Sequence, residues 1–231
     1  MHFGFFVKSL RRIFYPKVCV LCRLALVRTE NHLCIHCLKK LPKTRWVNPV
    51  NNPVFNVFRG RVPVVNAGAF LIFRRGGIAR QLMHEIKYKD NRDLAYWLGQ
   101  LYAQEISPLV FPSADVIIPV PLHHRKQKQR GYNQSEAFAQ GLGSKLNIPV
   151  NTENLRRLTY TQTQTRKSRW ERWRNVEDVF YIENPEALKG LQVMLVDDVV
   201  TTGATLEACA LSLMNAGVET IGIHVIAFAK E

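Results

Sequence analysis

The stretch from residue 193 to residue 205 reads VMLVDDVVTTGAT. Its first four residues are apolar and predict a buried strand, and the carboxylates of Asp197 and Asp198 follow directly. The next segment, 201–205, consists of small residues and leads into an apolar helical pattern. Backbone N–H groups at the start of a helix, together with threonine hydroxyls, bind phosphate groups. The stretch therefore predicts an anion-binding loop between a strand and a helix.

The acidic pair, Asp197 and Asp198, limits the kind of anion that this loop can bind. Two carboxylates repel a bare polyanion, so they need hydroxyl groups or a divalent cation as partners. A sugar phosphate that carries a metal ion supplies both. The alternative is a strand, an Asp-rich turn and a threonine helix cap without any ligand, but an uncompensated acidic pair at the end of a buried strand is costly.

The alternation of apolar strands and amphipathic helices extends along the chain from this stretch. Because the parallel strands of such folds are covered by helices on both faces, the pattern predicts an α/β fold with a doubly wound, mostly parallel sheet. Ligands of such sheets bind at the carboxyl ends of the strands. We expect strands at 64–73, 115–121, 179–182, 193–196 and 220–229, and helices at 78–86, 94–102, 134–146 and 204–215.

Two Cys-x-x-Cys knuckles near the amino end are separated by eleven residues, a spacing that lets four thiolates bind one structural zinc ion. The separation is short for a zinc ribbon, so we expect a tight second hairpin. Two disulfides are the alternative, but a chain without a signal peptide is expected in the cytoplasm, where thiols stay reduced. His32 and His36 could replace a ligand, although four cysteines already satisfy the metal. The expected zinc ligands are Cys19, Cys22, Cys34 and Cys37.

The fifth cysteine, Cys209, differs from these four in its surroundings. It lies in an apolar helical stretch, within 204–215. That position favours a buried structural thiol over a reactive nucleophile.

The pattern divides the chain into three parts. Residues 1–45 hold an amphipathic lead-in helix and the zinc-ribbon module, residues 46–63 form a linker, and residues 64–231 form the α/β domain. The lead-in segment, Phe3 to Phe14, has apolar residues at helical spacing, which favours packing against the rest of the chain over membrane contact. No apolar run approaches the roughly 18 residues that cross a bilayer, so we expect a cytoplasmic protein without a membrane span.

The charge of the chain is strongly positive and unevenly distributed. The 32 basic and 18 acidic residues leave a formal net charge of +14. Residues 1–45 hold ten basic residues and one acidic, residues 123–175 hold twelve and three, and residues 176–231 hold two and nine. The two basic blocks are either solvated surface or sites for phosphates or nucleic acid. In the first block, the candidates for contact with single-stranded DNA are Lys39, Lys40 and Lys43.

Residues 193–205 resemble the 5-phosphoribosyl 1-pyrophosphate (PRPP) motif of type I phosphoribosyltransferases, a hydrophobic strand with two acidic residues and then Thr-Thr-Gly-x-Thr. Other features are similar to the ComF (ComFC-like) family of competence-associated proteins. They are the cysteine knuckles, PVPLH at 119–123, RGYNQ at 130–134, IKYKD at 86–90 and DLA at 93–95. The resemblance covers nearly the whole chain and implies a type I phosphoribosyltransferase domain preceded by a zinc ribbon.

The resemblance implies a role for each matching residue. The catalytic Asp197 and Asp198 would hold the ribose hydroxyls, and Asp198 would also bind magnesium. The turn after the 115–121 strand would hold the pyrophosphate, because its cations can neutralise that leaving group, whereas a solvated turn is the alternative. The 5′-phosphate would lie on Thr201, Thr202, Gly203, Ala204 and Thr205, and the pyrophosphate side would hold His123, Arg125 and Arg130, with His124, Lys126 and Lys128 beside them.

Two further features of the sequence allow more than one interpretation. Gly131 could adopt a positive φ, and Asn133 could cap the next helix instead of touching a ligand. At 155–175, where related enzymes close a loop over PRPP, Trp170 and Trp173 could also stack on single-stranded nucleic acid or belong to the core. The residues that resemble the closing loop are Gln164, Arg169, Arg172 and Asn175.

No residue can be named as the base that activates a nitrogen nucleophile, so the acceptor is unidentified. The resemblance implies magnesium-dependent transfer of a phosphoribosyl group with release of pyrophosphate, in a protein associated with DNA uptake and natural transformation. The first alternative is a non-catalytic PRPP sensor. The second is a competence adaptor that holds single-stranded DNA or a DNA-uptake helicase through its zinc module and basic surface.

Overall fold

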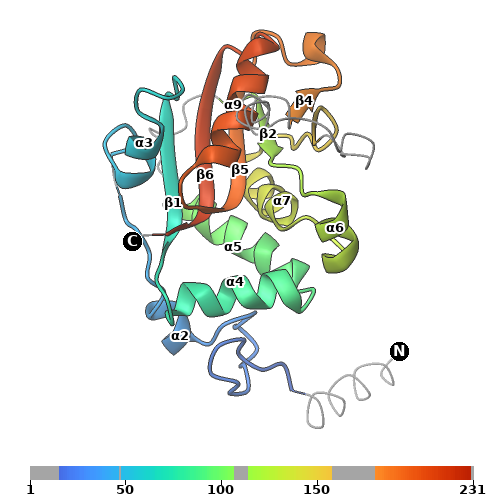
Figure 1. The fold of residues 1–231 in the computed structure, drawn as a ribbon. Coiled ribbons are helices and arrows are strands. Elements are labelled where there is room, and N and C mark those ends of the chain that lie inside the picture. The colour runs from blue at the N-terminus through green and yellow to red at the C-terminus, as the bar shows by residue number, and fades with distance from the viewer. Residues whose placement is uncertain (1–15, 47, 107–113, 158–179, 230–231) are drawn as a thin grey trace, which may run out of the picture.

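The computed structural model describes residues 16–46, 48–106, 114–157 and 180–229 (Figure 1). The strands are β1 (Asn66–Phe73), β2 (Val116–Pro119), β3 (Leu155–Arg157), β4 (Phe180–Ile182), β5 (Gln192–Val200) and β6 (Thr220–Ala229). The helices are α2 (Ile35–Lys39), α3 (Pro53–Phe58), α4 (Ile78–Tyr88), α5 (Arg92–Glu105), α6 (His124–Arg130), α7 (Gln134–Leu146), the 3-10 turn η2 (Pro185–Ala187) and α9 (Ala204–Asn215). None of the described helices combines the length and the apolar character needed to cross a membrane.

The main sheet is parallel throughout, with the strand order β1-β6-β5-β2. This order confirms the predicted α/β class with a parallel sheet. Strand β5 lies near the centre, and its pairing with β6 extends to the register pair of Val200 with Phe228. The acidic pair therefore lies inside the last part of a central strand, rather than after its end as the sequence predicted.

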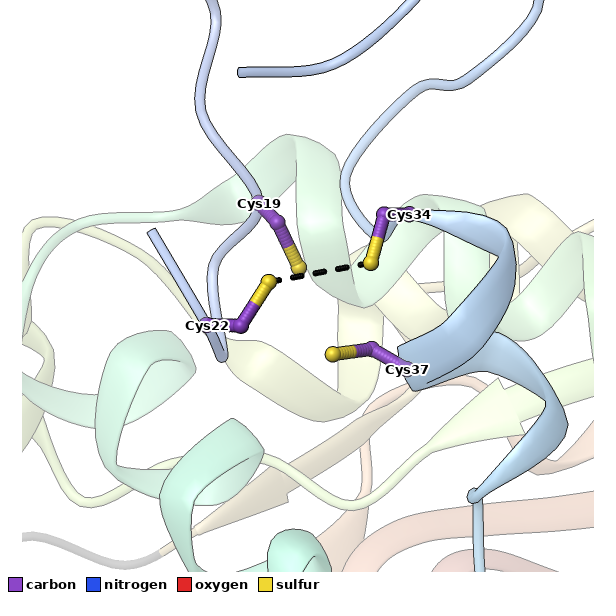
Figure 2. Close-up of side chains that lie close together, drawn as sticks. All are labelled: Cys19, Cys22, Cys34 and Cys37. Atoms are coloured by element: carbon purple, nitrogen blue, oxygen red, sulfur yellow. Dashed lines mark hydrogen bonds between the residues drawn. The ribbon is translucent and has the colours of Figure 1, made fainter. Parts of the chain in front are cut away.

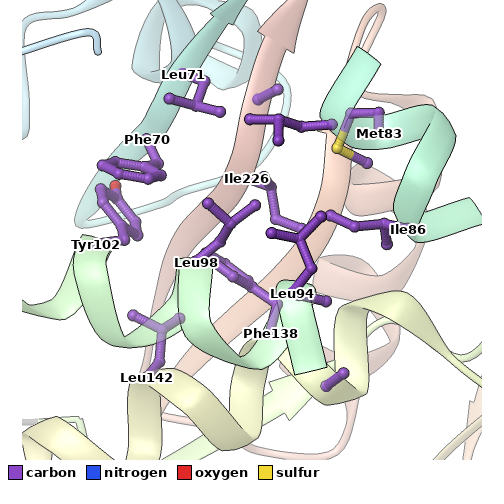
Figure 3. Close-up of a cluster of buried hydrophobic side chains, with 14 of the residues drawn as sticks. Phe70, Leu71, Met83, Ile86, Leu94, Leu98, Tyr102, Phe138, Leu142 and Ile226 are labelled. Atoms are coloured by element: carbon purple, nitrogen blue, oxygen red, sulfur yellow. The ribbon is translucent and has the colours of Figure 1, made fainter. Parts of the chain in front are cut away.

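The side chains of β5 alternate between two hydrophobic clusters, one on each face of the sheet. Val193 and Leu195 pack on the face covered by α3 and α9, whereas Met194 and Val196 pack on the face covered by α4, α5 and α7. Figure 3 shows this second cluster, in which side chains of the three helices meet those of β1 and β6. Burial on both faces explains why the strand reads as an unbroken apolar run.

Short segments pair with both outer strands of the sheet. The N–H of Ile72 donates to the carbonyl of Pro42 at 2.7 Å, and the N–H of Thr44 donates to the carbonyl of Phe70 at 3.0 Å. Residues 149–151 pair with β2 in the same way. Unpaired strand edges are templates for unwanted association, so this pairing protects the sheet and ties the amino-terminal part of the chain to β1.

The stretch predicted as a linker, 46–63, contains helix α3. The side chain of Asn52 caps it by accepting from the N–H groups of Val54 at 3.0 Å and Phe55 at 3.1 Å. Val54 and Phe58 are fully buried against the sheet. Hydrophobic periodicity did not indicate this helix, because six residues are too few to show a helical period in the sequence.

The basic segment after β2 also differs from its prediction. It forms helix α6, whereas the sequence predicted a loop. Its exposed polar residues carry no apolar stripe, so periodicity could not reveal it. The three-residue pair of β3 with β4 lies partly in the segment predicted as a loop from residue 155. The lead-in helix at 3–14 and the predicted roles of Trp170, Trp173 and the polar residues around them fall outside the described residues.

The cysteine-containing segment packs directly on the α/β core. Cys19, Leu33 and Leu41 belong to the same buried cluster as Leu94 and Leu98 of α5. Within residues 16–46, the part of this segment that the structure describes, the buried residues thus share the hydrophobic core of the sheet, and the division of the chain at residue 45 stays a prediction.

Three polar side chains form a hydrogen-bonded network between the sheet and helix α5. His224 of β6 lies 3.0 Å from the hydroxyl of Tyr102 through Nδ1 and 2.8 Å from Oδ1 of Asn66 through Nε2. Burial lowers the pKa of His224 to about 3, so the ring is neutral. Because Nε2 must donate to the amide oxygen, Nδ1 accepts from Tyr102. The network fixes β1, β6 and α5 relative to one another.

Candidate functional site

The 201–205 loop connects the end of β5 to the start of α9. Gly203 has a φ of 79° and precedes the first helical residue. The side chains of Thr201, Thr202 and Thr205 are exposed, whereas Gly203 is buried. A small open hollow runs from Asp197 along this loop to the first turn of α9. The structure thus places threonine hydroxyls and the N-terminus of a twelve-residue helix around one hollow beside the acidic pair.

Helix α3 supports this loop from the side away from solvent. A Cβ atom on Gly203 would lie 2.6 Å from Cγ1 of Val57 and 2.9 Å from Cε1 of Phe58. The guanidinium of Arg61 donates to the carbonyl of Thr202 at 2.7 Å and also forms an ion pair with Glu207 of α9. The contacts turn the Thr202 carbonyl toward Arg61. The role of α3 could not be read from the sequence, because it depends on contacts between distant segments.

We expect Gly203→Ala to lower the free energy of unfolding by about 3 kcal/mol, because it adds a steric overlap to a positive φ. Gly190→Ala is the matched control, since Gly190 also has a positive φ of 73° but no atom lies within 4 Å of its added Cβ. That control should cost only about 1 kcal/mol. Urea unfolding of both variants measures the difference. Equal losses of unfolding free energy in the two variants would show that α3 does not restrict the space at position 203.

The two carboxylates of the acidic pair have different partners. Oδ1 of Asp197 accepts from the hydroxyl of Ser135 at 2.8 Å and from the N–H of Asp198 at 2.8 Å. Oδ2 of Asp198 lies 2.9 Å from the ammonium of Lys87. The pair is thus partly buried and already has partners. The roles of Lys87 and Ser135 were missed, although Lys87 lies in the IKYKD run of the resemblance.

Burial, and after it the negative charge of Asp198, raise the pKa of Asp197 to about 7. The hydrogen bonds from Ser135 and the Asp198 N–H, and the positive charge of Lys87, oppose this rise. A carboxyl group with a pKa near 7 is present in both its protonated and its ionised form at physiological pH. A cation or a hydroxyl donor that approaches the pair would favour its ionised form.

The predicted pyrophosphate-side residues follow β2, the strand next to β5. The ring Nδ1 of His123 accepts from the N–H of Arg125 at 3.2 Å and so caps α6, whose residue Arg125 is exposed. Nη1 of Arg130 donates to the side chain of Gln134 at 2.9 Å, and its guanidinium lies 5.7 Å from the ring centroid of Tyr88. Contact of these residues with a pyrophosphate stays a prediction.

The residues between α6 and α7 act as a structural junction. Gly131 has a φ of 77° at the end of α6, as the sequence allowed. The hydroxyl of Tyr132 donates to the carbonyl of Ile86 at 2.6 Å, which joins this segment to α4. The side chain of Asn133 accepts from the N–H of Ser135 at 3.1 Å and donates to the carbonyl of Val120 at 3.0 Å. The helix-capping alternative for Asn133 is therefore confirmed.

The four cysteines of the knuckles converge, as Figure 2 shows. Their sulfur atoms all lie within 4.8 Å of one another, and those of Cys22 and Cys34 are 3.7 Å apart. Although burial raises the pKa of Cys19, backbone hydrogen bonds from Cys22 and Cys34 bring it to about 6. Soft thiolates in this arrangement fit a tetrahedral metal ion such as zinc. The second knuckle forms the N-cap and the first turn of helix α2, whereas the sequence predicted a tight hairpin.

The other residues that the sequence singled out, His32, His36 and Cys209, lie outside the cysteine cluster. His32 packs against Trp97 with ring centroids 5.5 Å apart, and neither His32 nor His36 belongs to the cysteine cluster. Cys209 is fully buried in α9, and burial raises its thiol pKa. A buried protonated thiol is unreactive, as the sequence predicted.

Comparison with known proteins matches residues 133–231 to a phosphoribosyl transferase domain. This span contains the acidic pair, the 201–205 loop and α7 with its Ser135. The residues that line the hollow therefore fall within the matched span.

Proteins with competence and DNA-utilization names are similar to this chain. DNA utilization protein YhgH of Salmonella typhi is 34% identical over 62% of this chain and 63% of its own length. Competence protein F of Haemophilus influenzae is 38% identical over 55% of each chain, and competence protein ComFC of Bacillus subtilis is 24% identical over 87% of this chain and 79% of its own. The chain thus matches less than two thirds of the length of YhgH.

Solved structures also resemble parts of the chain. The glutamine phosphoribosylpyrophosphate amidotransferase from B. subtilis, complexed with ADP and GMP, is 21% identical over 62% of this chain and 30% of its own length, with a TM-score of 0.44. A purine phosphoribosyltransferase from Pyrococcus horikoshii is 23% identical over 59% of this chain and 73% of its own, with a TM-score of 0.33.

Proposed function

We propose that this chain, in which residues 133–231 match a phosphoribosyl transferase domain and which is similar to competence protein F and ComFC, binds PRPP with magnesium. The bound PRPP would then donate its phosphoribosyl group to a nitrogen acceptor and release pyrophosphate. The observation that carries the proposal is the acidic pair beside the 201–205 loop at the start of α9. Carboxylates for sugar hydroxyls and a helix N-terminus for a phosphate meet there at one hollow.

Each part of the site would act on one part of the sugar phosphate. The hydroxyls of Thr201, Thr202 and Thr205, with the first N–H groups of α9, would donate to the 5′-phosphate. Asp197 and Asp198 would accept from the ribose hydroxyls and place the anomeric carbon near the end of β2. Magnesium, when bound, would neutralise charge on the phosphates and carboxylates, and the oxygen atoms of the acidic pair are ligands that suit it.

The leaving group would depart toward the residues that follow β2. Exposed cations of α6 can lower the free energy of a departing pyrophosphate by charge-assisted hydrogen bonds. In such a transfer the chemistry is mainly positioning and leaving-group stabilisation, so no protein base is required in the described residues. In this proposal the cysteine cluster takes no part in the transfer, and we assign it to a structural zinc ion.

Calorimetric titration with PRPP and magnesium tests binding, and pyrophosphate release with a panel of nitrogen bases tests transfer. We expect saturable binding of PRPP and release of pyrophosphate with at least one base. Binding without release would support a PRPP sensor instead of a transferase. Absence of PRPP binding in the zinc-loaded chain would refute the proposed function.

A second candidate function is contact with single-stranded DNA, as the competence names of the relatives suggest. The observation that favours it is the row of exposed side chains on α6, among them Arg125, Lys126 and Lys128. Lys39 and Lys40 are exposed as well. Lys43 is different, because it pairs with Glu105 and lies over the ring of Phe70, so we remove it from the predicted DNA-contact set.

Charge reversal at Lys126 and Lys128 should weaken single-stranded DNA binding, if α6 contacts DNA. The wild-type affinity should fall with salt at a slope of roughly 0.7 per phosphate neutralised, and the variant slope should be smaller. Fluorescence anisotropy with a labelled oligonucleotide at several salt concentrations measures both. Lys43→Glu is not a suitable control, because Lys43 is only 23% exposed and pairs with Glu105. Lys189→Glu is the better control, since Lys189 is 69% exposed, lies 3.9 Å from the similarly exposed Glu186 and is far from α6 in the sequence. An unchanged slope would mean that α6 is only a solvated surface.

A further inference from the structure

The last turn of α4 is held from two sides. The carboxylate of Glu85, which is buried, accepts from Arg23 of the first cysteine knuckle at 2.6 Å and from Lys89 at 2.9 Å. The carbonyl of the next residue, Ile86, accepts from Tyr132 at 2.6 Å, and the side chain of Ile86 is fully buried. The backbone from which Lys87 extends therefore has a fixed position.

From this turn the side chain of Lys87 reaches the acidic pair. Its ammonium lies 2.9 Å from Oδ2 of Asp198, and the side chains are only 22% and 15% exposed. The positive charge of Lys87 also acts on Asp197, whose pKa it lowers against the effect of burial. Other contacts of the pair come from Ser135, which donates to Asp197, and from the backbone of Asp198. In the described structure Lys87 is thus the cation that balances the acidic pair.

We propose that Lys87 is an internal counter-cation of the acidic pair that competes with a divalent cation for Asp198. As far as it concerns the sugar phosphate, the inference rests on the proposed function. The divalent cation then enters together with PRPP, whose phosphate oxygens offer the ammonium a new partner. Lys87 thereby keeps the divalent cation from occupying the site before PRPP binds.

The physical reason is the repulsion between like charges at short distance. A magnesium or manganese ion bound to Asp198 would lie about 2.1 Å from a carboxylate oxygen, close to the ammonium that contacts the same carboxylate. At that separation in a half-buried site, repulsion weakens binding of the ion or forces Lys87 to move away. A lysine has a flexible stem with a compact charge, so it can leave Asp198 without rearrangement of α4.

Titration of the zinc-loaded chain with Mn²⁺ alone, followed by electron paramagnetic resonance, tests this competition. Lys87→Met should bind Mn²⁺ at least about tenfold more tightly than the wild type, because the competing charge is gone. Lys87→Arg, which keeps the charge, should bind as weakly as the wild type. Lys89→Met is the matched control, because Lys89 lies on the same turn but pairs with Glu85 instead of the acidic pair.

Two further variants locate the effect. Lys87→Gln should repeat the gain of Lys87→Met, which protects the test against misfolding of a single variant. Adding Asp198→Asn to Lys87→Met should abolish the gain, since the ion would lose its carboxylate. Equal Mn²⁺ affinity of wild type, Lys87→Met and Lys87→Gln would overturn the proposal, as would a gain that survives Asp198→Asn.

The result is separable from the proposed function. A gain in Mn²⁺ affinity in Lys87→Met, with no PRPP binding by the wild type, would support the competition and refute only the PRPP site. Intact PRPP binding with unchanged Mn²⁺ affinity would refute only the role of Lys87.

Discussion

Replacement of both Asp197 and Asp198 by asparagine is expected to weaken PRPP binding by at least about a hundredfold. Both side chains line or adjoin the hollow at the 201–205 loop, and asparagine cannot offer two charged oxygens to the ribose hydroxyls or to a divalent cation. Calorimetric titration with PRPP and magnesium measures the loss. Glu219→Gln is the control, because Glu219 is an exposed carboxylate outside the site. PRPP affinity within twofold of the wild type would remove the acidic pair from the site.

The single variant Asp197→Asn should also change how stability depends on pH. An unfolded aspartate ionises near pH 4, whereas burial holds the pKa of Asp197 at about 7 in the folded chain. Between these values the folded state binds more protons than the unfolded state, so this residue lowers stability as pH rises from about 4 to about 7. Asparagine removes that loss, and Asp197→Asn should therefore gain on the order of 2 kcal/mol relative to the wild type at pH 8.

Urea unfolding at pH 5 and at pH 8 measures this dependence. The difference in stability between Asp197→Asn and the wild type should be larger at pH 8 than at pH 5. The hydrogen bond from Ser135 can still be accepted by the asparagine oxygen, so the comparison isolates the charge. A difference of the same size at both pH values would mean that Asp197 is ionised throughout this range.

Loss of the metal from the cysteine cluster is expected to have a second large effect. Cys34→Ser should remove zinc and unfold the segment of the knuckles, since small zinc sites fold only with their ion. Because Cys19, Leu33 and Leu41 share a buried cluster with α5, the variant should also lose about 2–5 kcal/mol of stability in the remaining α/β core, which should stay folded. Residual PRPP binding is expected, since the 201–205 loop lies in the core.

Elemental analysis and thermal unfolding measure these two effects together. The wild type should contain about one zinc per chain, the number that four thiolates can hold. His36→Asn is the matched control, because His36 lies between two ligands in the sequence but outside the cluster, and it should keep the zinc. Protein prepared without chelator that holds no zinc, with all four thiols free, would contradict the assignment.

The sequence by itself determined the fold class and the convergence of the four cysteines. The helices at 134–146 and 204–215 and the strand at 220–229 have the bounds that hydrophobic periodicity predicted. The knuckle spacing predicted that the cysteines meet, and they do. These features are local: each is encoded in the period of apolar residues, or in the distance along the chain between like residues.

Only the tertiary structure decided which side chains complete the site. Ser135 reaches Asp197 from 62 residues away in the chain, and Lys87 reaches Asp198 from farther still. Arg61 and α3 support the 201–205 loop from a stretch that had been predicted as a linker. No local pattern predicts such contacts, because the sequence around a polar helix residue does not show whether its side chain faces solvent or a distant carboxylate. Its partner is selected by the packing of α4, α7 and α3 around the sheet, which depends on the whole chain.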